Sequence, residues 1–464
     1  MSQRVVTDAI HGSIELTDEE WRVVDTPSFQ RLRHLKQLQM AHLTYPNATH
    51  TRFAHSLGVF AVMSKVLQNA QRTLQIGDDQ VSELRLAALL HDIGHYPYSH
   101  LMEKIDKVQL TEDFVQSEGA GAGKKSLDLS SAPSPYPKHE PLGELIVTTR
   151  TDLRDALGGP DRAKRIADLF TRSSAADPQL SKLIHSSLDM DRFDFLLRDA
   201  KATGVPFGGV DLNYLLSCVK VSPTGIIGFS HKAISAAEQF LFARFFMYKV
   251  VYFHKTTFGF EESCRQLLRR CRDEGLHEVP KSGDDIQRWV EGDNFLSFTD
   301  AWVDGVILKA MASEHPIIKQ LANSIVFRKP PALIREVAEL KDLSSGSAEH
   351  CRSFLKRCQD RLQDLGTRLD IDPRLFLVTG PSSIKLEDRS PKLTTETARG
   401  LEDEQQEELV KIFTPGQDEP RSLVDMPNSI VNVAAAHAYQ FARLYLVHDD
   451  RQVIEQARQQ VAEW

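Results

Sequence analysis

The most informative segment of the sequence is LRLAALLHDIGHYPYSH, residues 84–100. Its apolar first half has helical spacing and predicts a helix that ends at His91 and Asp92. Adjacent residues on a helix point about 100° apart, so both side chains can reach an ion beside that helix. His95 follows one turn later on the face of His91. Imidazole together with carboxylate suits Zn, Mn, Fe or Ni better than Ca, which prefers oxygen ligands.

Two other segments can complete such a site. His55 lies near the start of an amphipathic helix that opens at Arg52, and Asp191 lies in a later helical stretch. A lone His-Asp pair often occurs by chance, and such residues are usually surface or capping residues. The order H…HD…D, with a further histidine one turn on, favours a metal centre formed by His55, His91, Asp92 and Asp191.

Helical patterning covers most of the first 330 residues. The alternating apolar residues of 5–16 predict a short hairpin, and Pro27 predicts a helix start followed by Phe29, Leu32, Leu35 and Leu38. Residues 117–138 are rich in Gly, Ser, Ala and Pro and predict an inserted loop. Further helices are expected over 51–67, 82–90, from 140 onward, and over 163–170, 179–200, 234–271 and 284–321.

Lys329-Pro330-Pro331 breaks the helical pattern and is the predicted domain boundary. The remainder, 331–464, is mixed: a short strand over Leu375–Val378, a polar stretch over Glu387–Glu408, and a helix followed by a strand over Ile430–Leu446. The predicted fold class is therefore mainly α, with a smaller α+β region at the C-terminus. That region is a candidate for oligomerisation or regulation.

Composition limits the class of protein. With 464 residues, 41% hydrophobic, the chain can bury a large core, and its net charge of −8 argues against nucleic acid as the main partner. The five cysteines form no CxxC pair, and no signal peptide is recognisable at residue 1, so we expect reduced thiols and a cytoplasmic location. Cys264/Cys271 and Cys351/Cys358 are seven apart and are expected to be buried. The most apolar long stretch, 429–447, is too polar to span a membrane.

Five blocks, taken together, resemble the HD-domain deoxynucleoside triphosphate triphosphohydrolases, close to the vertebrate SAM-and-HD-domain branch and its bacterial relatives. The blocks are DTPSFQRLRHLKQL (25–38), THTRFAHSLGV (49–59), HDIGHYPYSH (91–100), LDMDRFDFLLRDA (188–200) and YFHK (252–255). The resemblance covers about residues 4 to 320 in order, within the predicted HD phosphohydrolase domain of residues 1–330. The resemblance implies an HD-domain helical bundle that hydrolyses a dNTP to a deoxynucleoside and inorganic triphosphate.

The same resemblance implies roles for the residues around the His-Asp pair. His55, His91, Asp92 and Asp191 would hold a divalent transition metal (Mn, Fe, Zn or Ni), with Mg as a candidate companion of the nucleotide. His95, His139 and Glu140 would form the catalytic group, with His100 in support. A histidine beside the phosphate can act as general acid toward the departing oxygen, and a carboxylate can orient it. The alternative for His139-Glu140 is an ordinary helix start with an acidic first turn.

Substrate contacts follow by position. Arg52 and Lys255 would meet phosphates, with Arg192 as a third cation, although each could be an ordinary surface charge. Asp199 would hold the sugar 3′-hydroxyl, and Tyr252 would pack on the ribose. A 2′-hydroxyl would clash with Tyr252 and with Leu38 beside Gln37. Arg244 is a weaker candidate that could instead pair with a carboxylate. Two departures affect this pocket: Phe195 replaces a tyrosine, and Gln39-Met40 replaces glycines.

An activating nucleotide is a further expectation. Asp25, Gln30 and Arg33 match positions that read an activating guanine nucleotide in the vertebrate branch, whereas Thr7 departs from the matching asparagine. The alternative is that Asp25 caps the helix and the others support an oligomer interface. We expect a homo-oligomer: a dimer, tetramer or hexamer.

Two other functions stay open. One is an HD phosphohydrolase acting on a nucleoside monophosphate or a signalling nucleotide. The other is a nucleotide-sensing protein with weak or no turnover. Product analysis separates them, because only the leading hypothesis releases inorganic triphosphate.

Overall fold

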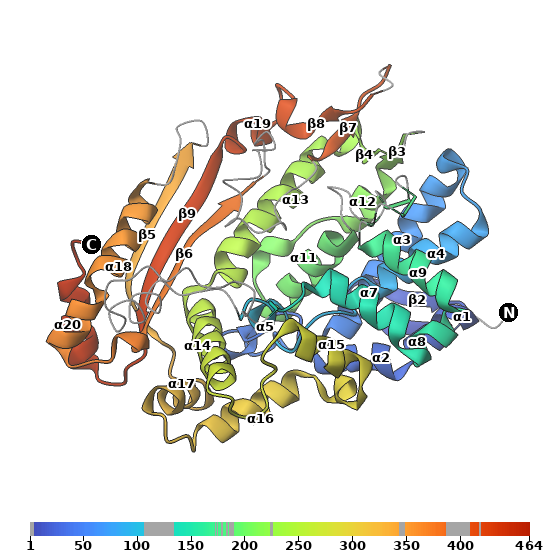
Figure 1. The fold of residues 1–464 in the computed structure, drawn as a ribbon. Coiled ribbons are helices and arrows are strands. Elements are labelled where there is room, and N and C mark those ends of the chain that lie inside the picture. Colours follow the sequence, from blue (N-terminus) through green and yellow to red (C-terminus); the bar gives the residue numbers. More distant parts are fainter. Residues whose placement is uncertain are drawn as a thin grey trace.

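A computed structural model describes residues 4–105, 134–171, 190–222, 226–342, 349–386, 409–416 and 419–464, with residues 173, 175–177, 180–181 and 184. The predictions for most of the loop 117–138, for 185–189 and for Glu387–Glu408 therefore lie outside the described residues. The described fold is mainly α, as predicted (Figure 1). A helical bundle lies on the side of the N-terminus, and a three-stranded sheet flanked by helices lies on the side of the C-terminus.

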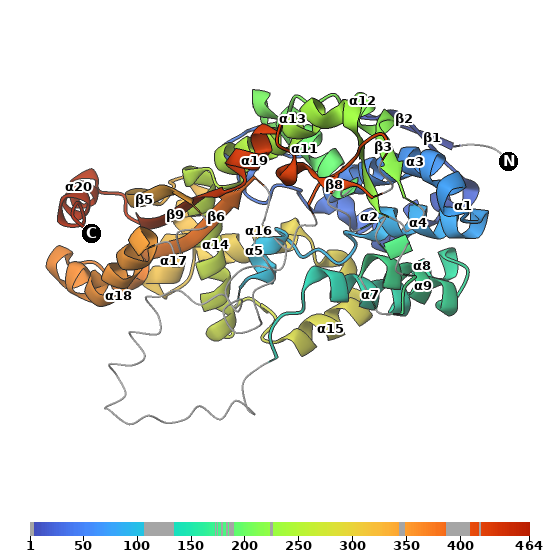
Figure 2. The same cartoon turned by 90° about the horizontal axis from the view of Figure 1, so that it is seen from above.

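The bundle opens with the predicted hairpin, in which Arg4 pairs with Leu16 and Asp8 with Gly12. A capping box between Thr17 and Glu20 then starts the first helix. The N-terminal elements are β1 (Arg4–Asp8), β2 (Gly12–Leu16), α1 (Asp18–Val24), α2 (Pro27–Gln30), η1 (Arg31–His34), η2 (Ala41–Leu43), α3 (Arg52–Leu74), α4 (Asp78–Leu90), α5 (His100–Glu103), α7 (His139–Thr149), α8 (Thr151–Ala156) and α9 (Pro160–Phe170). Figure 2 shows α7, α8 and α9 side by side on one flank of the bundle.

The helix predicted from Pro27 through Leu38 is wrong beyond its first turn. Thr26 caps α2, but the chain tightens to the 3-10 turn η1 and is extended at Leu35. The reason is a distant partner: the N–H of Gln37 donates to the carbonyl of His50, and the N–H of Arg52 donates to the carbonyl of Leu35. This pairing holds the segment against the start of α3.

The second half of the bundle contains α11 (Met190–Thr203), η4 (Pro206–Gly208), α12 (Leu212–Ser217), β3 (Val219–Val221), β4 (Ile227–Ser230), η5 (His231–Ala233), α13 (Ile234–Met247), η6 (Tyr248–Tyr252), α14 (Lys255–Asp273), α15 (Gly283–Glu291), η7 (Asp293–Ser297), α16 (Asp300–Ala310) and α17 (Pro316–Val326). The continuous helices predicted over 234–271 and 284–321 are therefore interrupted. The π-helical turn η6 ends at Tyr252, and π-turns are frequent at functional sites.

The C-terminal sheet has the order β5-β9-β6, and both pairings are antiparallel. Helix α18 contacts all three strands from one face, while Arg443 and Tyr445 on the opposite face bond to the carbonyls of Phe253 and Lys255. The predicted strand and helix-then-strand are confirmed. The elements are β5 (Ala332–Asp342), α18 (Glu349–Leu369), η9 (Pro373–Leu375), β6 (Phe376–Lys385), β7 (Lys411–Phe413), β8 (Arg421–Ser422), η11 (Leu423–Asp425), α19 (Ile430–Ala434), β9 (His437–Leu446) and α20 (Arg451–Gln460).

A third sheet links the middle of the chain to its C-terminal region. Its order is β3-β4-β7-β8, and β7 pairs in parallel with β4 through Phe229 and Ile412. Ser429 also bonds to Glu238 of α13. The division at residues 330/331 stays a prediction, and these contacts show that the C-terminal segment returns to the bundle.

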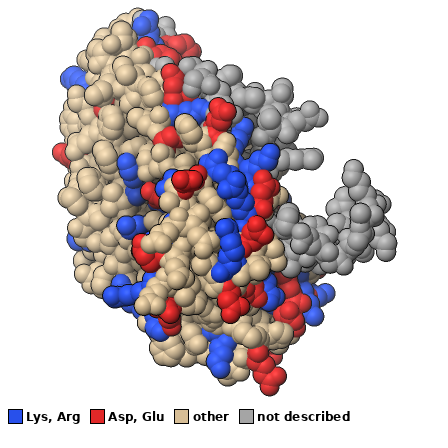
Figure 3. Space-filling model, turned by 90° about the vertical axis from the view of Figure 1, so that its left-hand side faces the viewer, with Lys and Arg blue, Asp and Glu red and all other residues tan. Residues whose placement is uncertain are grey.

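The cysteines, the surface charges and the apolar helices can be compared with the expectations from composition. The two cysteine pairs are buried free thiols, as predicted, and burial raises the pKa of Cys271 and of Cys358 to about 12. On the face drawn in Figure 3, Lys and Arg gather in a narrow band flanked by acidic side chains. Among the described helices, none is both long and apolar enough to cross a membrane.

Candidate active site

Three helices bring the predicted metal ligands together. His55 lies in the first turn of α3, His91 and Asp92 follow α4, and Asp191 lies in the first turn of α11. His55 Nε2 lies 2.7 Å from Asp191 Oδ1 and 3.6 Å from Asp92 Oδ2. His91 Nε2 lies 3.3 Å from Asp92 Oδ1 and 3.9 Å from Asp191 Oδ1. Both imidazole Nε2 atoms thus face the same two carboxylates.

The residues fit a divalent transition metal. His91 Nδ1 is held by the carbonyl of Ala88 and His55 Nδ1 by Asp194, which leaves both Nε2 atoms facing the carboxylates. The Nε2 atom of His91 is buried and makes no hydrogen bond. His55, His91 and Asp92 form one of three groupings among the described residues whose ligand atoms could meet at one ion.

Charges inside this set are strongly coupled. Burial alone would lower the pKa of His55, but the adjacent carboxylates of Asp191 and Asp194 raise it to about 10. Burial works against the charged form of Asp92, yet Arg52, with Nη1 2.5 Å from its Oδ2, keeps the pKa of that carboxyl well below its usual range. In this arrangement a guanidinium supplies the positive charge at Asp92.

The predicted catalytic histidines form a second group beside Asp92. His95 Nε2 lies 3.1 Å from Asp92 Oδ1, and its ring stacks on His139 with centroids 4.0 Å apart. His100 packs edge-on against both rings, at 5.0 Å and 5.3 Å. All three rings therefore lie together, next to the predicted metal set.

Glu103 is the carboxylate that orients this group. Its Oε2 lies 2.7 Å from His100 Nδ1, and its Oε1 lies 3.2 Å from His139 Nδ1 and accepts the backbone N–H of His139. Glu140, expected to orient His139, is more distant, with Oε2 3.6 Å from Nδ1. Glu103 thereby fixes both imidazoles through Nδ1.

The pKa values of the two stacked histidines, His95 and His139, are shifted in opposite directions. Burial, the charge of Arg52 and the neighbouring His139 hold the pKa of His95 well below its usual range. Burial also disfavours protonated His139, but the hydrogen bond and charge of Glu103 outweigh it and raise the pKa of His139. Two groups whose pKa values diverge in this way can serve as a proton acceptor and a proton donor.

The predicted sugar contacts meet at Asp199 on α11. This buried carboxylate lies 2.7 Å from His50 Nε2 and accepts the hydroxyl of Tyr252 at 2.5 Å. The ring of Phe195, one turn earlier, lies edge-on to Tyr252 with centroids 6.0 Å apart. Gln37 has a buried side-chain oxygen without a hydrogen-bond partner, and Leu38 is buried. The residues predicted to contact the sugar thus come from α11, η6 and the segment before α3.

The predicted cations differ in setting. Arg52 is buried, and its Nε donates to Ser99 Oγ. Arg192 is half-buried on α11 beside Asp191, and Lys255 is exposed at the start of α14. Arg244 is buried on α13 and donates to the carbonyl of Leu386.

The candidate activator residues lie around the turn from α1 into α2. Asp25 is exposed and is the C-terminal cap residue of α1, whereas the N-cap of the following helix α2, the role that the alternative gave to Asp25, belongs to Thr26. Gln30 donates to the carbonyl of Val24 and accepts from Arg33 at 2.7 Å. The guanidinium of Arg33 also lies over the ring of Phe53. Gln30 and Arg33 are therefore held as a pair beside the exposed carboxylate.

Sequence reasoning missed Glu103, Asp194 and His50. Glu103 follows His100 by three residues and Asp194 follows Asp191 by three, and both spacings place side chains on one helix face. Those spacings were a usable signal. His50 had none, because its contact with Asp199 joins residues 149 positions apart.

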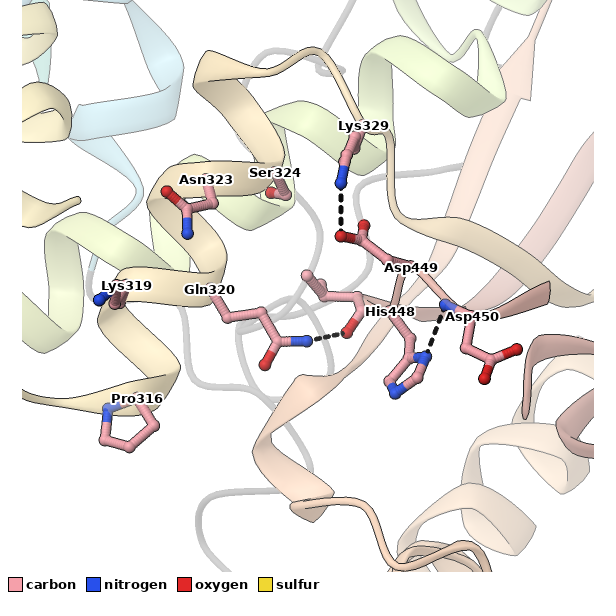
Figure 4. Close-up of a pocket in the computed structure, with 10 residues that line it drawn as sticks. Pro316, Lys319, Gln320, Asn323, Ser324, Lys329, His448, Asp449 and Asp450 are labelled. Carbon is pink, nitrogen blue, oxygen red and sulfur yellow. Dashed lines mark hydrogen bonds and ion pairs between the residues drawn. The ribbon is translucent and has the colours of Figure 1, made fainter. Parts of the chain in front are cut away.

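A pocket of about 440 Å³ lies elsewhere, between α17 and the end of β9. Figure 4 shows Lys329 reaching Asp449 and Gln320 reaching a backbone carbonyl across it. None of the predicted site residues lines this pocket, so it is separate from the histidine cluster.

Comparisons with known proteins agree with this geometry. The HD domain family matches residues 52–174, and the HD associated region matches residues 210–300. The chain therefore contains an HD domain, as its sequence resemblance implied. The uncharacterized protein YwfO of Bacillus subtilis is 32% identical over 278 residues, 60% of this chain and 57% of that protein. Human deoxynucleoside triphosphate triphosphohydrolase SAMHD1 is 28% identical over 223 residues, 44% of this chain and 34% of that protein.

Solved structures share the fold. A phosphohydrolase from Bacteroides thetaiotaomicron superimposes with a TM-score of 0.65 at 21% identity, covering 96% of this chain and 100% of that chain. A hypothetical protein from Aquifex aeolicus gives 0.69 at 20% identity, covering 99% and 100%. The chain spans about half the length of the curated relatives that it matches first.

Proposed function

We propose that the protein is a metal-dependent phosphohydrolase that converts dNTPs to deoxynucleosides and inorganic triphosphate. The observation that carries the proposal is the junction at Asp92, where the set of His55, His91 and Asp191 meets the stacked pair of His95 and His139. The similarity to SAMHD1 supports a deoxynucleotide as substrate.

A divalent metal held by His55, His91, Asp92 and Asp191 would supply Lewis-acid polarisation of the phosphate. His139, whose pKa is raised, donates a proton to the departing 5′-oxygen. Glu103 holds its Nδ1 and leaves Nε2 for that transfer. His95 stays neutral and accepts the proton of the water that attacks the α-phosphate as the bond from phosphorus to the 5′-oxygen breaks, and His100 shares the Glu103 carboxylate.

The remaining residues bind the nucleotide in this proposal. Arg52, Arg192 and Lys255 contact the phosphates. Asp199 accepts the 3′-hydroxyl and is held by His50 and Tyr252. The buried oxygen of Gln37 offers a further acceptor, and Leu38 with Tyr252 excludes a 2′-hydroxyl.

The test is one product assay. Purified protein is incubated with each dNTP and NTP, singly and mixed, with Mn or Mg, and inorganic triphosphate is separated by anion exchange. We expect triphosphate from dNTPs, abolished in Asp191→Ala and retained in Asp161→Ala, which removes an exposed carboxylate on α9. Monophosphate or diphosphate products would support the alternative HD phosphohydrolase, and full activity in Asp191→Ala would refute the metal assignment.

We also propose that Asp25, Gln30 and Arg33 bind an activating nucleotide and that the chain forms a homo-oligomer. The held pair of Gln30 and Arg33 beside an exposed carboxylate supports this. Light scattering with and without dGTP, on wild type and on Asp25→Ala, tests it. An oligomer size and a dNTPase rate that ignore dGTP would contradict activation.

A further inference from the structure

The tip of the N-terminal hairpin reaches the back of the predicted metal centre. His11 Nε2 lies 2.7 Å from Asp194 Oδ1, and Asp194 Oδ2 lies 2.7 Å from His55 Nδ1. The three side chains are at most 1% exposed. The carboxylate of Asp194 therefore bridges His11 of the hairpin and the predicted metal ligand His55.

A second contact joins the same two elements. Arg198 donates to Asp194 through Nε and Nη2, at 2.7 Å and 2.8 Å, and to Asp8 through Nη1 at 2.9 Å. Asp8 Oδ1 also accepts the backbone N–H groups of Ile10 and His11. Asp8 thus shapes the turn that presents His11 and anchors that turn to Arg198.

The carboxylate of Asp194 has all its acceptor positions occupied and is packed tightly against α3. An ionised carboxylate has about four acceptor positions, and here it meets His11, His55 and two Arg198 nitrogens. A Cβ on Gly58 of α3 would lie 1.8 Å from Asp194 Oδ1, so no space remains on that side. The carboxylate has one available position, and that position sets the orientation of His55.

We propose that His11 and Asp8 are positioning residues for the metal ligand His55, so that the hairpin sets metal affinity through Asp194. An Nδ1–H donated to Asp194 leaves the Nε2 lone pair of His55 for the metal. The inference rests on the metal centre within the proposed function and is independent of the substrate. A hairpin that only braces the fold would change stability and leave metal affinity unaltered.

The experiment measures metal, without nucleotide. Protein stripped with a chelator is titrated with Mn²⁺ against a fluorescent chelator, and the visible spectrum of the Co²⁺-loaded protein reports ligand geometry. The variants are His11→Ala, His11→Gln, which keeps a donor for Asp194, and Asp8→Asn. The matched control is Ser13→Ala, an exposed residue of the same hairpin. Thermal unfolding of each stripped protein shows whether it folds.

We expect His11→Ala to weaken Mn²⁺ binding by about 10- to 100-fold, the usual effect of losing an outer partner of a ligand. Asp8→Asn should weaken it in the same direction, and the Co²⁺ spectrum should change in both. His11→Gln should recover most of the affinity, and Ser13→Ala should stay within about twofold of wild type. If His11→Ala does not fold, Asp8→Asn and His11→Gln carry the comparison.

Two negative outcomes are distinguishable. A wild-type protein that binds Mn²⁺, with the same Kd in folded His11→Ala and Asp8→Asn, would overturn the role of the hairpin alone. A wild-type protein that binds no divalent metal would overturn the metal centre of the proposed function, and this inference with it.

Discussion

Replacing Glu103 with glutamine is the sharpest test of the proton-transfer group. The carboxylate holds Nδ1 of His100 at 2.7 Å and Nδ1 of His139 at 3.2 Å, and its side chain is 9% exposed. Glutamine keeps the size but removes the charge, and its amide NH₂ cannot accept from an imidazole N–H. One of the two histidines must therefore lose its acceptor.

The size of the effect follows from that lost bond. A hydrogen bond to a charged group contributes about 1.5–3 kcal/mol, and the low exposure leaves little solvent screening. At about 1.4 kcal/mol per tenfold, kcat/KM for the dNTP should fall by roughly 10- to 150-fold.

The pH dependence should change as well. The raised pKa of His139 contributes stability that is complete below its unfolded value of about 6.5 and is lost as the pH rises through the folded value. The depressed pKa of Glu103 contributes stability above about pH 4.5 and loses it as the pH falls. Wild type should therefore exceed the variant in Tm most clearly between about pH 4.5 and 6.5. The limb of the rate profile that reports protonated His139 should move to lower pH.

The assay is triphosphate release from pH 5 to 9, with calorimetric Tm on the same samples. The control is Glu144→Gln on α7, which removes a carboxylate paired with Lys164 at the surface and should change either quantity little. A Glu103→Gln enzyme within twofold of wild type, with an unmoved pH limb, would refute the assignment of Glu103.

Three other substitutions test the rest of the site. Tyr252→Phe removes the hydroxyl that donates to Asp199 and should raise KM for the dNTP by about 2- to 12-fold with kcat less affected; steady-state kinetics showing no KM change would contradict the sugar contact. Gly58→Ala places a Cβ 1.8 Å from Asp194 Oδ1 and should destabilise the protein by about 1–3 kcal/mol in urea unfolding, whereas Gly305→Ala, with open space around it, should not. Arg198→Met removes the guanidinium that Asp8 and Asp194 share and should cost about 3–5 kcal/mol by the same measurement, and a cost under about 1 kcal/mol would show that the other partners of the two carboxylates, such as His11 and His55 at Asp194, suffice without it.

The parts of the site that local patterning predicts are those carried by long amphipathic helices. His55 and Asp191 lie in the first turns of α3 and α11, and His91 and Asp92 directly follow α4, so each of them adjoins a segment with helical periodicity. Packing α3 against α4 and α11 buries their apolar faces and brings the three positions together. The order of the residues along the chain was therefore enough to expect the cluster.

Non-local contacts explain the failures. Residues 35–37 have helical spacing, but their backbone pairs with 50–52, and that bridge takes priority over local propensity. His11 reaches Asp194 across 183 residues, so no window of sequence contains both. The spacing of three residues between His100 and Glu103 could have identified Glu103. The orienting role was instead predicted for Glu140, because it is adjacent to His139. Adjacency in sequence is a poor guide at a helix start, where the first side chain can turn away from its neighbour.

The turn after the His-Asp pair shows how the fold holds the site against local preference. Tyr98 and Ser99 both have a positive φ, 51° and 53°, which costs about 1–3 kcal/mol for each residue with a side chain. Asp300 and Asp304 on α16 offset this by accepting the N–H and the hydroxyl of Tyr98. Ser99 in that turn holds Arg52 Nε, and His100 follows it directly at the start of α5. Because the same strained turn fixes Arg52 beside Asp92 and His100 beside Glu103, α16 connects the predicted metal ligands to the histidines proposed for proton transfer.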